Sequence, residues 1–276
     1  MTAVVDAGEI RGDAGIDGAA ASLLTGALLV GACLNGLAVR VLEAWRRHGI
    51  ESPLMGITPF EIIAILVAAR LVMQPDARRT ALWPWPELAL GAAMLVPSSA
   101  VVWGAVAVYS LLGVRCASPG RRGGIALFLA LAACSIWSSV LLKWIAGPAA
   151  ALEAHAVWAL LSPWRPDMAV TGNVVGVPEG HNLIIMIACT AASGVPKALL
   201  GLVALVMLAG GGGGRRTALA GVMVAGLHAA VNTLRLMLMA WSGALYLLIH
   251  GPIGANAFDA AQTLLVVALG LWAAKA

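Results

Sequence analysis

The sequence predicts an all-α polytopic integral membrane protein, a bundle of about seven to nine transmembrane helices. Of its 276 residues, 61% are hydrophobic and only 11% are charged, whereas a soluble domain carries about 25% charged residues. Apolar stretches recur that are long enough to cross the roughly 30 Å of hydrocarbon in a bilayer. Backbone polar groups must be satisfied internally in lipid, so we expect these stretches to be helices.

The chain begins with a polar segment, residues 1–18, in which acidic residues outnumber the single Arg11. A signal peptide would carry a positive N-terminal region, which this segment lacks. We therefore expect an extracytoplasmic N-terminus followed by a single transmembrane domain over residues 19–276.

In the first half of the chain, short basic segments separate the apolar stretches. The expected spans cover residues 19–39, 57–73, 88–114 and 125–145. Pro97 interrupts the third stretch, which forms either one kinked helix or two short ones. Residues 148–163 are apolar but short, which suits a surface helix or a re-entrant segment.

Residues 165–182 are the least membrane-like part of the chain. Gly172, Asn173 and Pro178 mark turns, and the valines among them favour extended structure, so we expect a hairpin-like loop at the membrane surface. Three further spans follow, at residues 183–208, 218–241 and 258–272. A run of glycines separates the first two, and a short loop holding His250 separates the last two.

The basic residues predict the orientation of these spans. Cytoplasmic loops are enriched in Lys and Arg, which places on the inside Arg40, Arg46, Arg47, Arg215, Arg216 and Lys275. With seven spans Arg115, Arg121 and Arg122 also lie inside, and with nine they lie outside. In both arrangements the 165–182 loop and His250 face the extracytoplasmic side, where Arg78, Arg79 and Arg165 are exceptions to the rule.

Three reactive residues fall at a similar depth on that outer side. Cys189 lies near the outer end of the fifth span, Arg235 lies late in the outward-running sixth span, and His250 follows it. A thiolate is a nucleophile, a His can activate it or protonate a leaving amine, and an intramembrane Arg can stabilise an oxyanion. Together they would form a complete site for acyl transfer.

The motifs around these residues resemble those of the exosortase/archaeosortase family. Residues 189–194 read Cys-Thr-Ala-Ala-Ser-Gly, residues 232–235 read Asn-Thr-Leu-Arg, and His250 is followed by Gly254 and Phe258. The order Cys, Arg, His is similar to the family's, over about residues 165–265. Gly194 lies five residues after Cys189, whereas the glycine of the usual family motif comes sooner. This departure leaves the substrate subclass open.

The resemblance implies a membrane cysteine transpeptidase or protease that cleaves C-terminal sorting signals of exported proteins at the outer membrane surface. Such a signal has a short motif, a transmembrane helix and a basic tail. By resemblance, Cys189 is the nucleophile that forms a thioacyl intermediate, Arg235 the oxyanion stabiliser and His250 the general acid/base. The catalytic residues would be supported by Asn232, His228, Ser193 and Gly194. The protein would lie in the cytoplasmic membrane. No metal, organic cofactor or nucleic-acid partner is expected.

Two other classes of protein remain open. A rhomboid-like intramembrane serine protease would use Ser193 with His228, although the His-x-x-x-Asn motif and the serine occur here in the opposite order along the chain. A non-enzymatic transporter or assembly scaffold would use the broken stretch at Pro97 and the intramembrane charges Glu61, Arg70 and Lys143.

Overall fold

The computed structural model describes residues 9–48, 57–74, 84–212 and 214–275. The chain divides into two compact units, one ending at Ile136 and the other beginning at Trp137. The first eight residues of the predicted polar N-terminal segment lie outside the described residues. A single transmembrane domain over residues 19–276 stays a prediction.

The described residues of the first unit form five helices. They are α1 (Glu9–His48), α2 (Pro59–Val72), α3 (Pro84–Met94), α4 (Ser99–Cys116) and α5 (Pro119–Ile136). The apolar stretch around Pro97 therefore forms two helices rather than one kinked helix. The side chain of Asn35 donates a hydrogen bond to the Met94 carbonyl (2.8 Å), near the C-terminal end of α3, where no further helical N–H follows.

A buried carboxylate in the first unit is fully engaged. Glu61 is only 1% exposed, forms an ion pair with Arg40 (2.8 Å) and accepts a hydrogen bond from the Thr58 N–H (2.8 Å). This pairing offsets the cost of burying its charge. Arg70 is exposed. These contacts give Glu61 a structural role in joining α1 to α2.

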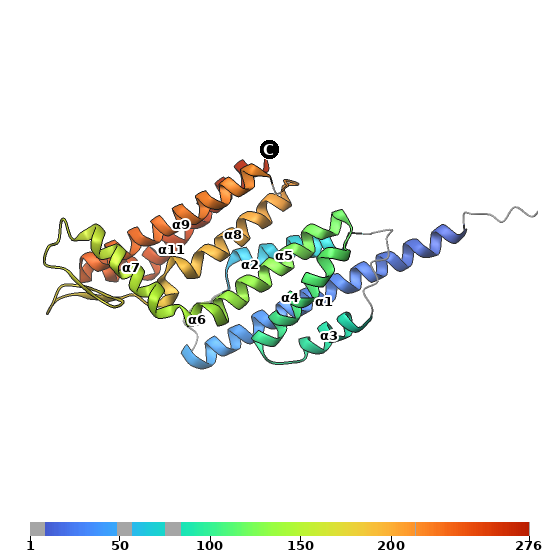
Figure 1. The fold of residues 1–276 in the computed structure, drawn as a ribbon, viewed down its shortest axis with the longest axis horizontal. Helices are drawn as coiled ribbons and strands as arrows, with labels where there is room; N and C mark the ends of the chain where they lie inside the picture. Colours follow the sequence, from blue (N-terminus) through green and yellow to red (C-terminus); the bar gives the residue numbers. More distant parts are fainter. Residues whose placement is uncertain (1–8, 49–56, 75–83, 213, 276) are drawn as a thin grey trace, which may run out of the picture. The chain divides into compact units, whose positions relative to one another are not determined.

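The second unit combines helices with a small sheet (Figure 1). It begins with a π-helical turn η1 (Trp137–Leu141), α6 (Leu142–Trp144) and α7 (Ala146–Leu161). The strands β1 (Ala169–Thr171), β2 (Val174–Gly176) and β3 (Asn182–Ile184) lead to a 3₁₀ turn, η2 (Ile187–Cys189). The remaining helices are α8 (Ala191–Leu208), α9 (Arg215–Trp241), α10 (Gly243–His250) and α11 (Pro252–Ala274).

The sheet confirms the predicted extended segment and extends it by a third strand. β1, β2 and β3 form an antiparallel meander in that order, with Thr171 paired to Val174 and Val175 to Leu183. Gly172 has φ +59°, the conformation required at the first position of a two-residue hairpin loop of type II′. Glycine adopts it without a steric penalty.

Two expectations for this half of the chain are wrong. The fifth apolar stretch does not form a helix from residue 183, because β3 and η2 precede α8, which begins at Ala191. His250 is not in a loop but is the last residue of α10. Ser242 starts that helix by accepting a hydrogen bond from the Leu245 N–H (3.2 Å), a cap that hydropathy does not reveal.

Six helices in the described residues are long and apolar enough to cross a membrane, as expected of a multi-pass helical membrane protein. These segments are Ser22–Glu43, Ser99–Cys116, Pro119–Trp144, Ala191–Leu208, Arg215–Trp241 and Pro252–Ala274. With 14 and 16 residues, α2 and α7 fall below the usual length of about 20 residues for a span.

The glycines after α8 end that helix and turn the chain toward α9. Gly210 has φ +75°, its N–H donates to the Met207 carbonyl, and the Gly211 N–H donates to the Val206 carbonyl. This pair of hydrogen bonds is a Schellman motif, which needs a left-handed residue after the helix. Consequently α8 and α9 pack against each other, and α11 packs against both.

The core of the second unit lies between the sheet and the helices α7 and α9. Its buried residues are Ala150, Ala154, Val157, Leu161, Met168, Val175, Leu183, Ile185, Leu236, Met239 and Ala240. Tyr246 and Ile249 of α10 pack against this cluster, and so does Cys189. The sheet, α10 and the cysteine therefore share one core at the end of the unit where α8 begins and α9 ends.

Candidate functional site

Cys189 occupies the tight turn that leads into α8. Its N–H donates to the Met186 carbonyl (2.8 Å), and the Thr190 N–H donates to the Ile187 carbonyl (3.1 Å). Thr190 is the N-cap residue of α8. The cysteine is a free, half-buried thiol, placed beside a helix N-terminus, where negative charge is favoured.

Side chains from two other helices hold this turn. Asn232 of α9 donates from Nδ2 to the Cys189 carbonyl (2.9 Å) and to Glu153 Oε2 of α7 (3.2 Å). The other carboxylate oxygen of Glu153 accepts a hydrogen bond from the Ala191 N–H (2.5 Å). An amide nitrogen carries two hydrogens, so both are used in linking α7, α9 and the cysteine turn.

A third contact to the start of α8 comes from η1. Proline has no N–H, so Pro196 leaves the Ala192 carbonyl without its usual helical donor four residues on. Trp137 Nε1 donates a hydrogen bond to that carbonyl (3.0 Å). A π-helical turn, which is frequent at functional sites, thus supplies the hydrogen bond that the proline removes.

Glu153 is a site residue that the sequence analysis did not select. Burial raises the pKa of its carboxyl group, while the hydrogen bonds from Ala191 and Asn232 oppose that shift by stabilising the carboxylate. It is the one acidic residue in the apolar sequence of α7. That isolated carboxylate was the signal in the sequence, but its partners are distant in the chain and become visible only in the fold.

Arg235 lies on the same face of α9 as His228 and Asn232. At 3.6 residues per turn, the three residues fall within about 60° of the helix circumference. The Arg235 Nε is buried without a hydrogen-bond partner, and among the described residues the guanidinium forms no ion pair. Its charge is therefore available to an anionic group that enters the site.

His228 and Gly194 pack closely where α9 crosses the first turn of α8. A Cβ atom at position 194 would collide with the His228 ring, so the glycine allows this approach. His228 is buried, and its Nδ1 has no hydrogen-bond partner among the residues that the structure describes. Ser193 Oγ lies within hydrogen-bond distance of the carbonyls of Thr190 (2.8 Å) and Ala188 (3.1 Å).

His250 belongs to an aromatic column on the outside of the same core. Its ring stacks on Tyr246 with centroids 5.0 Å apart, and Tyr246 contacts His181 with centroids 5.8 Å apart. His181 Nε2 donates to the Met239 carbonyl (2.8 Å) near the end of α9. The imidazole of His250 itself is exposed.

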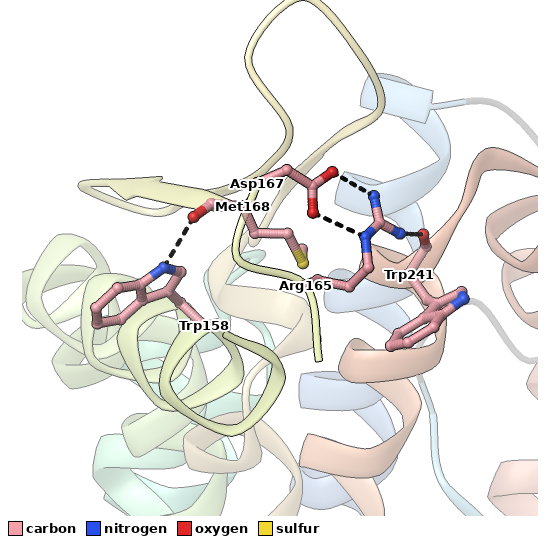
Figure 2. A network of polar contacts seen from close by, with 5 residues as sticks. All are labelled: Trp158, Arg165, Asp167, Met168 and Trp241. Atoms are coloured by element: carbon pink, nitrogen blue, oxygen red, sulfur yellow. Dashed lines mark hydrogen bonds and ion pairs between the residues drawn. The ribbon is translucent and has the colours of Figure 1, made fainter. Parts of the chain in front are cut away.

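A polar network fixes the end of α9 to the segment before the sheet (Figure 2). Arg165 donates to both carboxylate oxygens of Asp167 (3.0 and 2.9 Å) and to the Trp241 carbonyl (3.0 Å), and its guanidinium lies over the Trp241 ring. Trp158 Nε1 donates to the Met168 carbonyl (3.1 Å). Arg165 is one of the basic residues that do not fit the predicted orientation. Its positive charge is partly neutralised by the Asp167 carboxylate.

An apolar groove of about 330 Å³ lies beside this network. Its walls come from the end of α7, from α9 and from α10, and are formed by Leu161, Trp164, Leu234, Met237, Leu238, Trp241 and Leu245. Tryptophans concentrate at membrane–water interfaces. The groove runs along the part of α9 that carries Arg235.

The structure thus brings together some of the predicted residues and not others. Asn232 contacts the Cys189 backbone, and Gly194 packs on His228. In the described part of the chain, no hydrogen bond joins the side chains of Cys189, Arg235 and His250, and none joins Ser193 to His228. The described residues also contain no group of three or more His, Cys, Asp or Glu side chains that could hold a metal ion.

Comparisons with protein-family models, with curated proteins and with solved structures found no match for this chain.

Proposed function

We propose that this chain is an exosortase-like cysteine transpeptidase or protease of the cytoplasmic membrane, with seven to nine spans and its site on the extracytoplasmic side. Its substrates are exported proteins with a C-terminal sorting motif, a transmembrane helix and a basic tail. The observation that carries the proposal is the held turn at Cys189. Its carbonyl is bound by Asn232, on the helix face that also carries Arg235, whose buried Nε has no hydrogen-bond partner in the described part of the chain.

In the proposed reaction, His250 takes the proton of the Cys189 thiol, the thiolate attacks the scissile carbonyl, and a carbon–sulfur bond forms. Arg235 stabilises the negative oxygen of the tetrahedral intermediate. The carbon–nitrogen bond then breaks, and the leaving amine takes a proton from His250. Water or an acceptor amine attacks the thioester, which releases the acyl group and restores the thiol.

The exposure of His250 suits this role, because its ring can meet a substrate that approaches from the outer surface. Catalytic contacts often form only in the complex with substrate. The apolar groove along α9 offers a surface of the right chemistry for the apolar part of such a tail.

The serine-protease alternative receives less support. The Ser193 hydroxyl is engaged by backbone carbonyls of its own turn, and His228 faces Gly194. The transporter alternative loses Glu61, whose charge is paired with Arg40.

The test is complementation of a deletion strain, with exported proteins followed by mass spectrometry of their C-termini. Cys189→Ala should leave C-terminal tails uncleaved, as in the deletion, while the control Cys116→Ala, at an exposed cysteine, should restore processing. Arg235→Ala should reduce processing by at least about a hundredfold, the usual loss when an oxyanion donor is removed. Full processing with Cys189→Ala, or its loss with Ser193→Ala alone, would refute the cysteine mechanism.

A further inference from the structure

Glu153 has a position that packing alone does not explain. It projects from α7 toward two donors at the start of α8 and on α9, and its two oxygens accept from different residues, Ala191 N–H and Asn232 Nδ2. Glu153 is half-buried, and a carboxylate that loses part of its water needs hydrogen bonds to offset the cost. The chain bears that cost next to its free, half-buried Cys189.

The direction of these hydrogen bonds determines how Asn232 is oriented. A carboxylate only accepts hydrogen bonds, so Glu153 requires the NH₂ group of Asn232 to face it. The second hydrogen of that NH₂ group then points to the Cys189 carbonyl. If the amide turned over, its oxygen would face both the Glu153 carboxylate and the Cys189 carbonyl, and both contacts would be repulsive.

We propose that Glu153 is a positioning residue of the Cys189 site, which acts through Asn232 and the Ala191 N–H to fix the cysteine turn against α8 and α9. This inference rests on the proposed function. It adds a role for α7, which carries none of the family-like motifs. A nucleophile must be held to within about 0.5 Å of its productive geometry, and a displacement of about 1 Å can cost a hundredfold in rate.

The experiment exchanges the polarity of the Glu153–Asn232 pair. In Glu153→Gln one of the two acceptors becomes an NH₂ group, which must face either the Ala191 N–H or the Asn232 NH₂ group. In Asn232→Asp two carboxylates oppose each other. The double variant Glu153→Gln/Asn232→Asp restores a hydrogen bond between α7 and α9 and keeps the net charge. Its carboxylate at position 232, however, cannot donate to the Cys189 carbonyl.

The full-length variants are measured in nanodiscs, with a tail-bearing protein that accumulates in the Cys189→Ala strain as substrate. Both single variants should lower the unfolding temperature and kcat. The double variant should recover part of the lost unfolding temperature, because the hydrogen bond between α7 and α9 returns while the one to the Cys189 carbonyl does not. Its kcat should stay at least about tenfold below wild type, with KM within about twofold. Iodoacetamide should still alkylate Cys189 in every variant.

Asn173→Asp is the matched control. Asn173 also donates to a backbone carbonyl, that of Ile185 in the segment before η2 (3.0 Å), so this variant should lower stability without the selective loss of kcat. Recovery of kcat in the double variant, or normal kcat in Glu153→Gln, would show that Glu153 is only structural. A different result would refute the proposed function itself: the Cys189→Ala variant would still process the substrate.

Discussion

Hydrogen-bond satisfaction explains the residues around Cys189 better than their individual chemistry does. The turn before α8 exposes backbone groups that a continuous helix would satisfy. Glu153, Asn232 and Trp137 provide partners for the Ala191 N–H, the Cys189 carbonyl and the Ala192 carbonyl. Each comes from a different element, so the turn is held from three directions.

The contact between Trp137 and Ala192 leads to a prediction with a built-in rescue. Trp137→Phe should destabilise the second unit by about 1–3 kcal/mol, because the Ala192 carbonyl loses its donor. Pro196→Ala supplies an N–H at that position, so the double variant Trp137→Phe/Pro196→Ala should regain much of this loss. Thermal unfolding in detergent measures both effects. If the double variant were as unstable as Trp137→Phe, the indole would act by packing rather than by its hydrogen bond.

At the scale of elements, the segment after α7 and the end of α9 are joined by polar contacts over an apolar core. Arg165 donates to the Trp241 carbonyl, one of the last carbonyls of α9, which have no helical N–H to accept from. His181 does the same for the Met239 carbonyl. These contacts fix the sheet next to the groove and to the helix that carries Arg235.

The Arg165–Asp167 ion pair predicts a pH dependence of stability. The hydrogen bond from Arg165 holds the pKa of Asp167 below its usual value. Its stabilising effect is therefore fully present above the pKa that Asp167 has in the unfolded chain, and is lost as the pH falls through the lower folded pKa. The difference in unfolding temperature between wild type and Asp167→Asn should accordingly shrink toward zero on acidification.

Because both side chains are partly exposed, this difference should be small even at neutral pH. In an Arg165→Gln background, Asp167→Asn should have no such pH-dependent effect. A pH dependence that persists without Arg165 would assign the shift to another group.

For the molecule as a whole, the second unit has two chemically distinct ends. At one end lie the sheet, Cys189 and α10, and at the other lie the glycine turn and two exposed arginines, Arg215 and Arg216. The helices α8, α9 and α11 connect the two ends and are long and apolar enough to span a bilayer. The positive-inside rule predicts that these arginines lie inside, and the cysteine end would then face outward.

This orientation can be measured with single cysteines in a variant whose four native cysteines are replaced by alanine. Thr171→Cys lies on the exposed edge of the sheet, and a Cβ at Gly212 meets no atom within 4 Å, so both positions should tolerate the change. A membrane-impermeant maleimide should label Thr171→Cys in intact cells and Gly212→Cys only after permeabilisation. The opposite pattern would place Cys189 in the cytoplasm and refute the proposed function.

The sequence by itself predicted the helical class, the extended segment before Cys189 and the approximate positions of the long helices. Hydropathy, proline and glycine act over a few neighbouring residues, so these features are encoded locally. The break at Pro97 was foreseen as one of two alternatives. The start of α8 was predicted too early, because the apolar residues of β3 and η2 fit the pattern of a membrane span. The helix α10 was predicted as a loop, because it is short and lies between two longer apolar stretches.

Only the tertiary structure decided which polar groups meet. Glu153 lies 38 residues from Ala191 and 79 from Asn232, and no local pattern encodes such pairings. They arise because α7, α8 and α9 pack on one core and every buried donor and acceptor in it needs a partner. That requirement, rather than any motif, brought Glu153 to the cysteine turn. The buried Nε of Arg235, on the same face of α9 as Asn232, is an exception, because it has no hydrogen-bond partner among the described residues.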